Sequence, residues 1–217
     1  MTNINGKAYA MNAITPIKPW KTPILRLIFF ILDVWKAKQQ DLKNLSFIHF
    51  ARWVIIRRDQ WPDLGQGKQV LSYDYMLFCS NFNGTWDQYI DAFSDGIPDG
   101  LDLFWYSSVK YPHSIPINPF KSYITYNQID TDYYYNATPG AAQRDIKSAL
   151  TILGEIRGLA VRYSALTPQN FTKEYLKSLL KLQNCLGSQG AAPTASLDTE
   201  MAERIRLHLG PPNPAGT

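Results

Sequence analysis

The chain has 217 residues with a formal net charge of +4, and its 45% of hydrophobic residues excludes a globally disordered protein. The length allows one well-packed domain with flanking segments. Two cysteines, Cys79 and Cys185, form no CxxC pair, so the sequence indicates a reducing compartment and we expect a cytoplasmic protein.

The positive charge is concentrated in the first 45 residues, where seven Lys or Arg and two acidic residues give a net charge of +5. Residues 1–19 are polar and contain two prolines, and we interpret them as a mobile lead-in. A helix is predicted over residues 24–36, and its apolar run is far shorter than the ~20 residues needed to cross a bilayer. The stretch from Ile24 to Trp35 has tryptophans and lysines near its ends. It therefore packs on the domain, packs on a second subunit, or lies on a membrane surface, where we expect the inner membrane.

Two strands are predicted next. Residues 47–56 place apolar side chains on both faces, which is typical of a central strand, so His49 and Arg52 need polar partners. Residues 75–82 form the second strand, which ends at the turn signal Asn83-Gly84.

A helix follows that turn, because Thr85 and Gln88 have the spacing of a capping box. The pattern then predicts a strand at residues 101–107, a helix opened by Asn118-Pro119 and a strand at residues 133–135. Thr138-Pro139 is predicted to open a long helix. Its inward-facing residues are expected to be Ala142, Ile146, Leu150, Leu153 and Ile156.

The end of the chain has a different character. Thr167-Pro168 caps a basic amphipathic helix that stops at Gly187. We interpret residues 187–193 as a flexible linker, residues 198–209 as a short helix and residues 211–217 as disordered.

The order of these elements predicts an α+β fold, a two-layer sandwich in which helices cover one face of a mainly antiparallel sheet. The apolar second face of the first strand needs a cover, which is either a second subunit in a homodimer or the N-terminal helix. We divide the chain into a basic N-terminal flank (1–45), an α+β core domain (46–165) and a helical tail (166–217).

Two stretches resemble a bacterial family that shares an HFARW and an SNFxGxWDxYxxxF pattern. They are HFARWVII at residues 49–56 and LFCSNFNGTWDQYIDAF at residues 77–93, and the resemblance covers roughly residues 46–156. That family is in turn similar to the ferredoxin-like α+β domains of dye-decolourising peroxidases and chlorite-dismutase-like proteins. The resemblance implies a ferredoxin-like antiparallel sheet with helices on one face, extended here by the N-terminal helix and the helical tail.

The same resemblance suggests a catalytic residue. Dye-decolourising peroxidases carry a Gly-x-x-Asp-Gly motif whose Asp acts in peroxide cleavage, and residues 96–100 match it in letters, with Asp99 at the acidic position. The same five residues also suit a helix-to-strand turn for backbone reasons alone. Haem would need a proximal histidine, for which the sequence offers His49, His113 and His208.

Other constellations favour no further chemistry. Asp87, Asp91 and Asp95 share one helix face, which we interpret as solvated rather than as a metal site. The dispersed histidines and cysteines lack zinc-ligand spacing, and no nucleotide-binding or acyl-transfer motif occurs. Residues 101–107 are aromatic but lack the basic pattern of RNA-binding sheets, so we expect no nucleic-acid partner.

The candidate site is therefore a set of polar residues among the aromatics. Its candidate catalytic residues are His49, Arg52 and Asp99. Its candidate ligand-binding residues are Asn81, Asn83, Trp86, Tyr106 and Tyr135. The plainer interpretation is that these residues satisfy turns and neighbouring side chains of the fold.

Two functions stay open. The first is an accessory or binding α+β domain, without a cofactor, that takes an apolar small molecule or a protein partner near a membrane. The alternative is a small oxidative enzyme, either haem-dependent and peroxidase-like or a cofactor-free oxygenase. In that enzyme Arg52 or Asp99 would act on peroxide or oxygen, with His49 or His113 as ligand or base.

Overall fold

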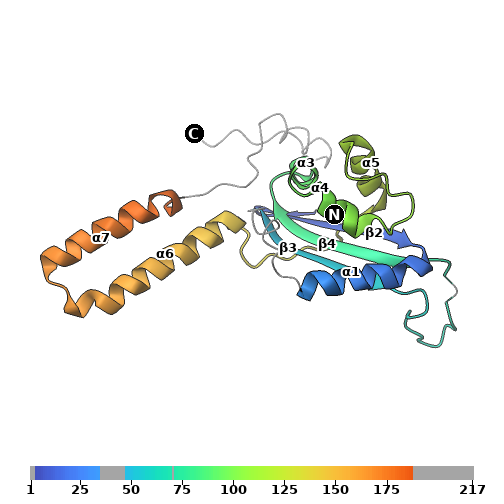
Figure 1. Ribbon diagram of the computed structural model, residues 1–217. Coiled ribbons are helices and arrows are strands. Elements are labelled where there is room, and N and C mark those ends of the chain that lie inside the picture. Colours follow the sequence, from blue (N-terminus) through green and yellow to red (C-terminus); the bar gives the residue numbers. More distant parts are fainter. Residues whose placement is uncertain (1–2, 35–46, 70, 188–217) are drawn as a thin grey trace.

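The computed structural model describes residues 3–34, 47–69 and 71–187 (Figure 1). Within them the fold is α+β, an open antiparallel sheet with six α-helices. The strands are β1 (Ile4–Asn5), β2 (Ala8–Ile17), β3 (Ile48–Ile56), β4 (Asp74–Asn83) and β5 (Gln128–Ile129). The helices are α1 (Thr22–Val34), α3 (Trp86–Gly96), α4 (Pro98–Trp105), α5 (Ile117–Asn127), α6 (Gln143–Arg162) and α7 (Pro168–Leu182).

The N-terminal stretch is a central strand, so its interpretation as a mobile lead-in is wrong. β2 pairs with β4 along its whole length, from Ala8 opposite Asn83 to Ile17 opposite Asp74. The inward side chains of β2 are all buried, and they are Tyr9, Met11, Ala13, Thr15 and Ile17. Small and polar residues among them weaken the hydrophobic signal, although the alternation is regular.

β3 is an edge strand, which corrects its predicted central position. The sheet order is β1-β2-β4-β3, and β5 pairs with β2. Ala51, Trp53 and Ile55 of β3 face the core, whereas Phe50 is 74% exposed on the other face. A bulge between Ile48 and Phe50 shifts the register at His49. The apolar residues on the outer face of β3 are therefore exposed, and the apolar pattern of β3 does not mark a strand with neighbours on both sides.

Four helices close the inner face of the sheet over an aromatic core. Tyr89 of α3 stacks on Phe82 and donates a hydrogen bond from its hydroxyl to Ser80 Oγ at 2.7 Å. α4 and α5 contribute Trp105 and Phe120, and α1 adds Leu25. The predicted capping box holds the start of α3, since the Thr85 side chain accepts from the Gln88 amide.

The predicted strand at residues 101–107 is wrong, because this segment belongs to helix α4. Leu101 and Trp105, four residues apart, are both buried on the core side, which is the helical spacing. The alternation of Leu101, Leu103 and Trp105 imitates a strand in the sequence. Asp102 stabilises the following loop by accepting hydrogen bonds from the Tyr111 hydroxyl at 2.8 Å and the Ser114 amide at 2.7 Å.

The predicted strand at residues 133–135 is also wrong. Tyr133 and Tyr135 are exposed, and the segment has no strand pairing. It is held at the end of the sheet instead, where the Tyr134 carbonyl accepts from Asn5 Nδ2 at 2.8 Å and its hydroxyl accepts from Asn81 Nδ2 at 2.9 Å.

Helices α6 and α7 form a hairpin that projects from the sheet (Figure 1). Thr167 caps α7 as predicted, but α6 begins only at Gln143. Ala142 is buried, whereas the other residues predicted to face inward are exposed, namely Ile146, Leu150, Leu153 and Ile156. The reason is that α6 extends past the end of the sheet, where its main contacts among the described residues are with α7 and the short turns that flank α7.

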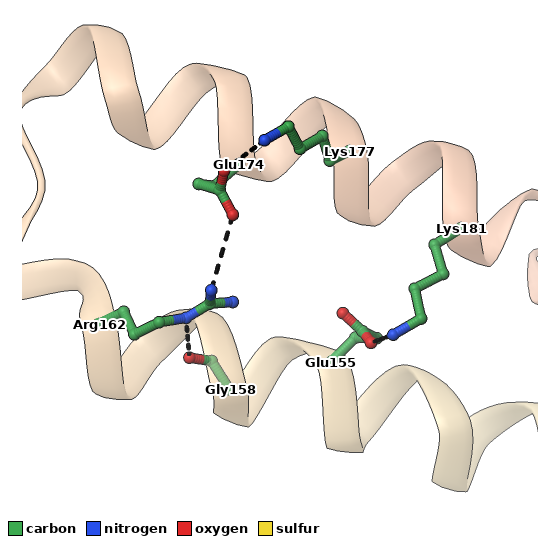
Figure 2. A network of polar contacts seen from close by, with 6 residues as sticks. All are labelled: Glu155, Gly158, Arg162, Glu174, Lys177 and Lys181. Atoms are coloured by element: carbon green, nitrogen blue, oxygen red, sulfur yellow. Dashed lines mark hydrogen bonds and ion pairs between the residues drawn. The ribbon is translucent and has the colours of Figure 1, made fainter.

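The two helices of this hairpin contact each other along a narrow seam. Leu159 and Leu182 are buried there. Figure 2 shows the ion pairs beside the seam, in which Glu174 contacts Arg162 at 3.6 Å and Lys177 at 2.8 Å, and Glu155 pairs with Lys181. The predictions for the linker beyond Gly187, for residues 198–209 and for residues 211–217 lie outside the described residues.

Candidate functional site

The predicted polar site residues form three groups, the first of which surrounds Asn83 at the end of β4. The buried Asn83 amide donates from Nδ2 to the Lys7 carbonyl at 2.6 Å and accepts from the Gln143 amide at 2.8 Å. His49 lies beside it at the β3 bulge. Burial lowers the pKa of His49, and a hydrogen bond with Asn83 partly offsets that effect. The Nε2 atom of His49 is buried and has no hydrogen-bond partner among the described residues.

The second place is the outer face of the sheet. Arg52 lies opposite Cys79, and Phe50 lies opposite Asn81, so the Arg52 and Asn81 side chains are neighbours on this face. Arg52 is exposed. The N-terminal helix does not cover this face, because its Leu25 and Phe29 pack into the core on the inner side. A second subunit as its cover stays a prediction.

The third group shares its elements rather than one place, because its residues lie on, or directly after, helices α3 and α4. Trp86 is buried and donates from Nε1 to Gln128 Oε1 at 2.7 Å. Tyr106 lies beneath Lys21, whose Nζ is 4.6 Å from the ring centre. Asp99 is exposed in the first turn of α4, so the Gly-x-x-Asp-Gly letters mark a junction between two helices, not the predicted helix-to-strand turn. Among the described residues, Tyr106 and Asp99 make no hydrogen bond or ion pair with His49 or Arg52.

The aromatic core leaves almost no space for a ligand. A void of only about 10 Å³ lies between sheet and helices, about enough for one water molecule. Its lining includes Phe78, Tyr89 and Trp105. The aromatic side chains between the sheet and the helices therefore fill the core and do not line a ligand cavity there.

Helix α1 departs from ordinary burial although it packs against the core domain. This helix has apolar side chains almost all round, and a helix of that kind is normally buried. Here only one side packs on the core, through Leu25 and Phe29. The opposite side carries a row of exposed apolar residues that we call the α1 outer row: Ile24, Leu27, Phe30, Ile31 and Val34. Leu27 is 56% and Phe30 65% exposed.

A groove of about 460 Å³ lies at the N-terminal end of the same helix. We call it the arginine groove. Its lining residues are Pro19, Thr22, Pro23, Arg26, Arg57, Arg58, Asp59 and Asp74. A second groove of about 400 Å³ shares Arg26 and Arg57 with it and continues between α1 and the β3 edge. His49, Arg52 and Asn81 line neither groove.

Sequence reasoning missed the arginine groove. The doublet Arg57-Arg58 directly after a strand was the available signal. Arg26 is some 30 positions away in the chain, and only the packing of α1 beside β3 brings it to the doublet. The excess of positive charge in the first 45 residues includes Arg26 and so indicates one side of the groove. It does not indicate Arg57 and Arg58, which form the other side.

Two of the three aspartates that share a face of α3 form ion pairs within the fold. Lys121 of α5 contacts Asp87 at 2.9 Å and Asp91 at 2.8 Å. Among the residues that the structure describes, no group of three or more His, Cys, Asp or Glu is arranged to hold a metal ion. None of the described helices is long and apolar enough to cross a bilayer.

Comparisons of the chain with family models, with curated proteins and with solved structures find no match. The resemblance to the bacterial HFARW family therefore stays a prediction.

Proposed function

We propose that this protein is a peripheral membrane-binding domain that docks on an anionic bilayer through α1. The observation that carries the proposal is the α1 outer row, a line of five large apolar side chains that the described part of the fold leaves in solvent. Burying one such side chain fully contributes roughly 1.5–3 kcal/mol, so partial insertion of five is enough for reversible binding.

The charges beside the row favour a membrane over another apolar surface. Lys18 and Lys21 come just before α1, and Arg26 of α1 lines the arginine groove together with Arg57 and Arg58. Trp20, which is also exposed, adds an aromatic side chain suited to the headgroup region. Basic residues next to an exposed apolar helix are the usual composition of an interfacial anchor on anionic lipids.

We infer that the domain behind this helix is ferredoxin-like. In its support, the strands lie in the order β5-β2-β4-β3 with antiparallel neighbours, α1 connects β2 to β3, and α3 to α5 connect β4 to β5. A split β-α-β arrangement of this kind is the hallmark of that fold. Its packed core supports an accessory binding role rather than a role in holding an apolar small molecule between sheet and helices.

Vesicle flotation with matched substitutions tests the proposal. Deletion of the basic N-terminal flank (1–45) is not a suitable test of membrane docking, because it also removes strand β2 from the sheet. The variant Leu27→Ser with Phe30→Ser changes only exposed positions and is expected to weaken binding to phosphatidylserine-containing vesicles by about tenfold or more, since about 1.4 kcal/mol is tenfold.

The control is Leu150→Ser with Leu153→Ser on α6. These leucines are also exposed, Leu150 to 63%, and lie on the hairpin. The control protein is expected to float like the wild type. Equal flotation of the α1 variant and the wild type, or loss only in the hairpin variant, contradicts docking through α1.

A further inference from the structure

The arginine groove has more positive charge than its own acids engage. Asp74 accepts from the Thr22 hydroxyl at 2.5 Å and from the Arg58 backbone amide at 2.8 Å, so it holds α1 against the end of β3. Asp59 pairs with Arg57 at 2.6 Å. The guanidinium groups of Arg26 and Arg58 have no ion pair with any described residue.

Guanidinium groups suit one ligand chemistry particularly well. Each presents a planar fork of donors that matches two oxygens of a phosphate, which a lysine ammonium cannot do. Two guanidinium forks without an ion pair in one groove can together engage the three terminal oxygens of a phosphomonoester. A phosphodiester has only two such oxygens, which a single fork already occupies.

The arginine groove lies beside the α1 outer row, so a phosphate bound in the groove would be close to the bilayer surface. Arg26 lies on α1 between Leu25, which enters the core, and Leu27, which belongs to the α1 outer row. A helix lying at the interface places its apolar side near the acyl boundary and its flanking cations at headgroup level. The arginine groove would then open at the depth where lipid phosphates lie.

We propose that the arginine groove binds the phosphomonoester headgroup of an anionic lipid, with Arg26 and Arg58 as the principal ligands. This inference rests on the proposed membrane docking through α1 and adds a preference for one headgroup class. Arg57 supplies a third guanidinium, which exchanges part of its contact with Asp59 for the phosphate.

The test compares two kinds of vesicle at equal surface charge, one with phosphatidic acid and one with phosphatidylserine. The variant Arg26→Gln with Arg58→Gln is compared with Arg157→Gln with Lys173→Gln, which removes two exposed cationic side chains of the α6–α7 hairpin. The groove variant is expected to lose about tenfold or more in affinity for phosphatidic acid vesicles and the control about threefold or less, because only the groove variant loses the specific ligands as well as charge.

A soluble probe separates the site from the membrane. Titration with glycerol 3-phosphate, followed by calorimetry, is expected to show binding that the groove variant loses and the control keeps. If the wild type floats with neither vesicle but still binds glycerol 3-phosphate through Arg26 and Arg58, the phosphate site stands and membrane docking fails.

Two further outcomes would contradict the phosphate site. If the wild type prefers neither vesicle and both double variants weaken binding equally, the groove is not a phosphate site, although docking through α1 stands. If the protein binds neither vesicles nor glycerol 3-phosphate, both proposals fail.

Discussion

At the scale of single residues, Asn83 connects three distant parts of the chain. Its amide contacts Lys7 in the turn before β2, Gln143 at the start of α6, and His49 at the β3 bulge. Gly6 makes this junction tight, since a Cβ there would lie 2.0 Å from the Pro139 carbonyl oxygen. The polar residues that look functional in the sequence therefore contribute first to joining the sheet to the hairpin.

The stability of the protein should depend on His49 in mildly acidic solution. Burial lowers its pKa below the ordinary value of 6.5, so between the two values the unfolded chain binds more protons than the folded chain. The free energy of unfolding should then fall as the pH drops through about 6.5. Urea denaturation at a series of pH values measures this, and His49→Gln should flatten the curve. An unchanged slope in that variant would show that another group is responsible.

At the scale of elements, α1 and α6 both expose apolar side chains, but they differ in what their other side packs against. Both helices leave a row of them in solvent, but α1 packs on the core through Leu25, whereas α6 packs mainly on α7 within the described part of the chain. The hairpin therefore depends on few buried residues, and its stability is set locally.

A pair of leucine substitutions measures that local stability. Leu159 is 7% exposed in the seam, so Leu159→Ala should destabilise the hairpin by about 2–3 kcal/mol. Leu150→Ala, at an exposed position of the same helix, should change it by less than about 0.5 kcal/mol. Hydrogen exchange of the α6 and α7 amides reports the difference. Similar protection factors in both variants would argue against the seam as the basis of the hairpin.

At the scale of the whole molecule, the sheet depends on its first long strand. β2 lies between β4 on one side and β1 and β5 on the other, and its inward residues are part of the core. The described part of the basic N-terminal flank is thus structurally continuous with the core domain, through β2 and through Leu25 of α1, even though its composition differs.

Removing residues 1–18 should abolish cooperative folding. The truncation takes away the ten-residue ladder on β4, so the backbone groups along that edge of β4 lose their partners and the core loses the inward side chains of β2. Thermal unfolding followed by near-ultraviolet circular dichroism should lose its sigmoidal transition. A truncated chain that melts cooperatively near the wild-type temperature would contradict the central role of β2.

Local pattern was sufficient for several elements of this protein. The strands β3 and β4, the capped start of α3, the helix α5 and the Thr167 cap of α7 were all predicted close to their observed places. In each, the signal lies within a few residues, as alternation, a capping box or a proline at the first turn. The apolar character of α1 was equally visible.

Tertiary structure alone decided which faces of these elements are covered. Alternation in β2 is masked by Ala13 and Thr15, and only pairing with β4 makes it a buried strand. The segment that forms α4 alternates like a strand, and packing on the core selects the helix. The exposed row on α1 and the meeting of Arg26 with Arg58 depend on contacts between residues far apart in the chain. The amino-acid sequence by itself determined the elements with strong local signals and their apolar sides. Non-local packing decided the ambiguous segments and which side of each element remains open, because periodicity carries no information about what lies opposite.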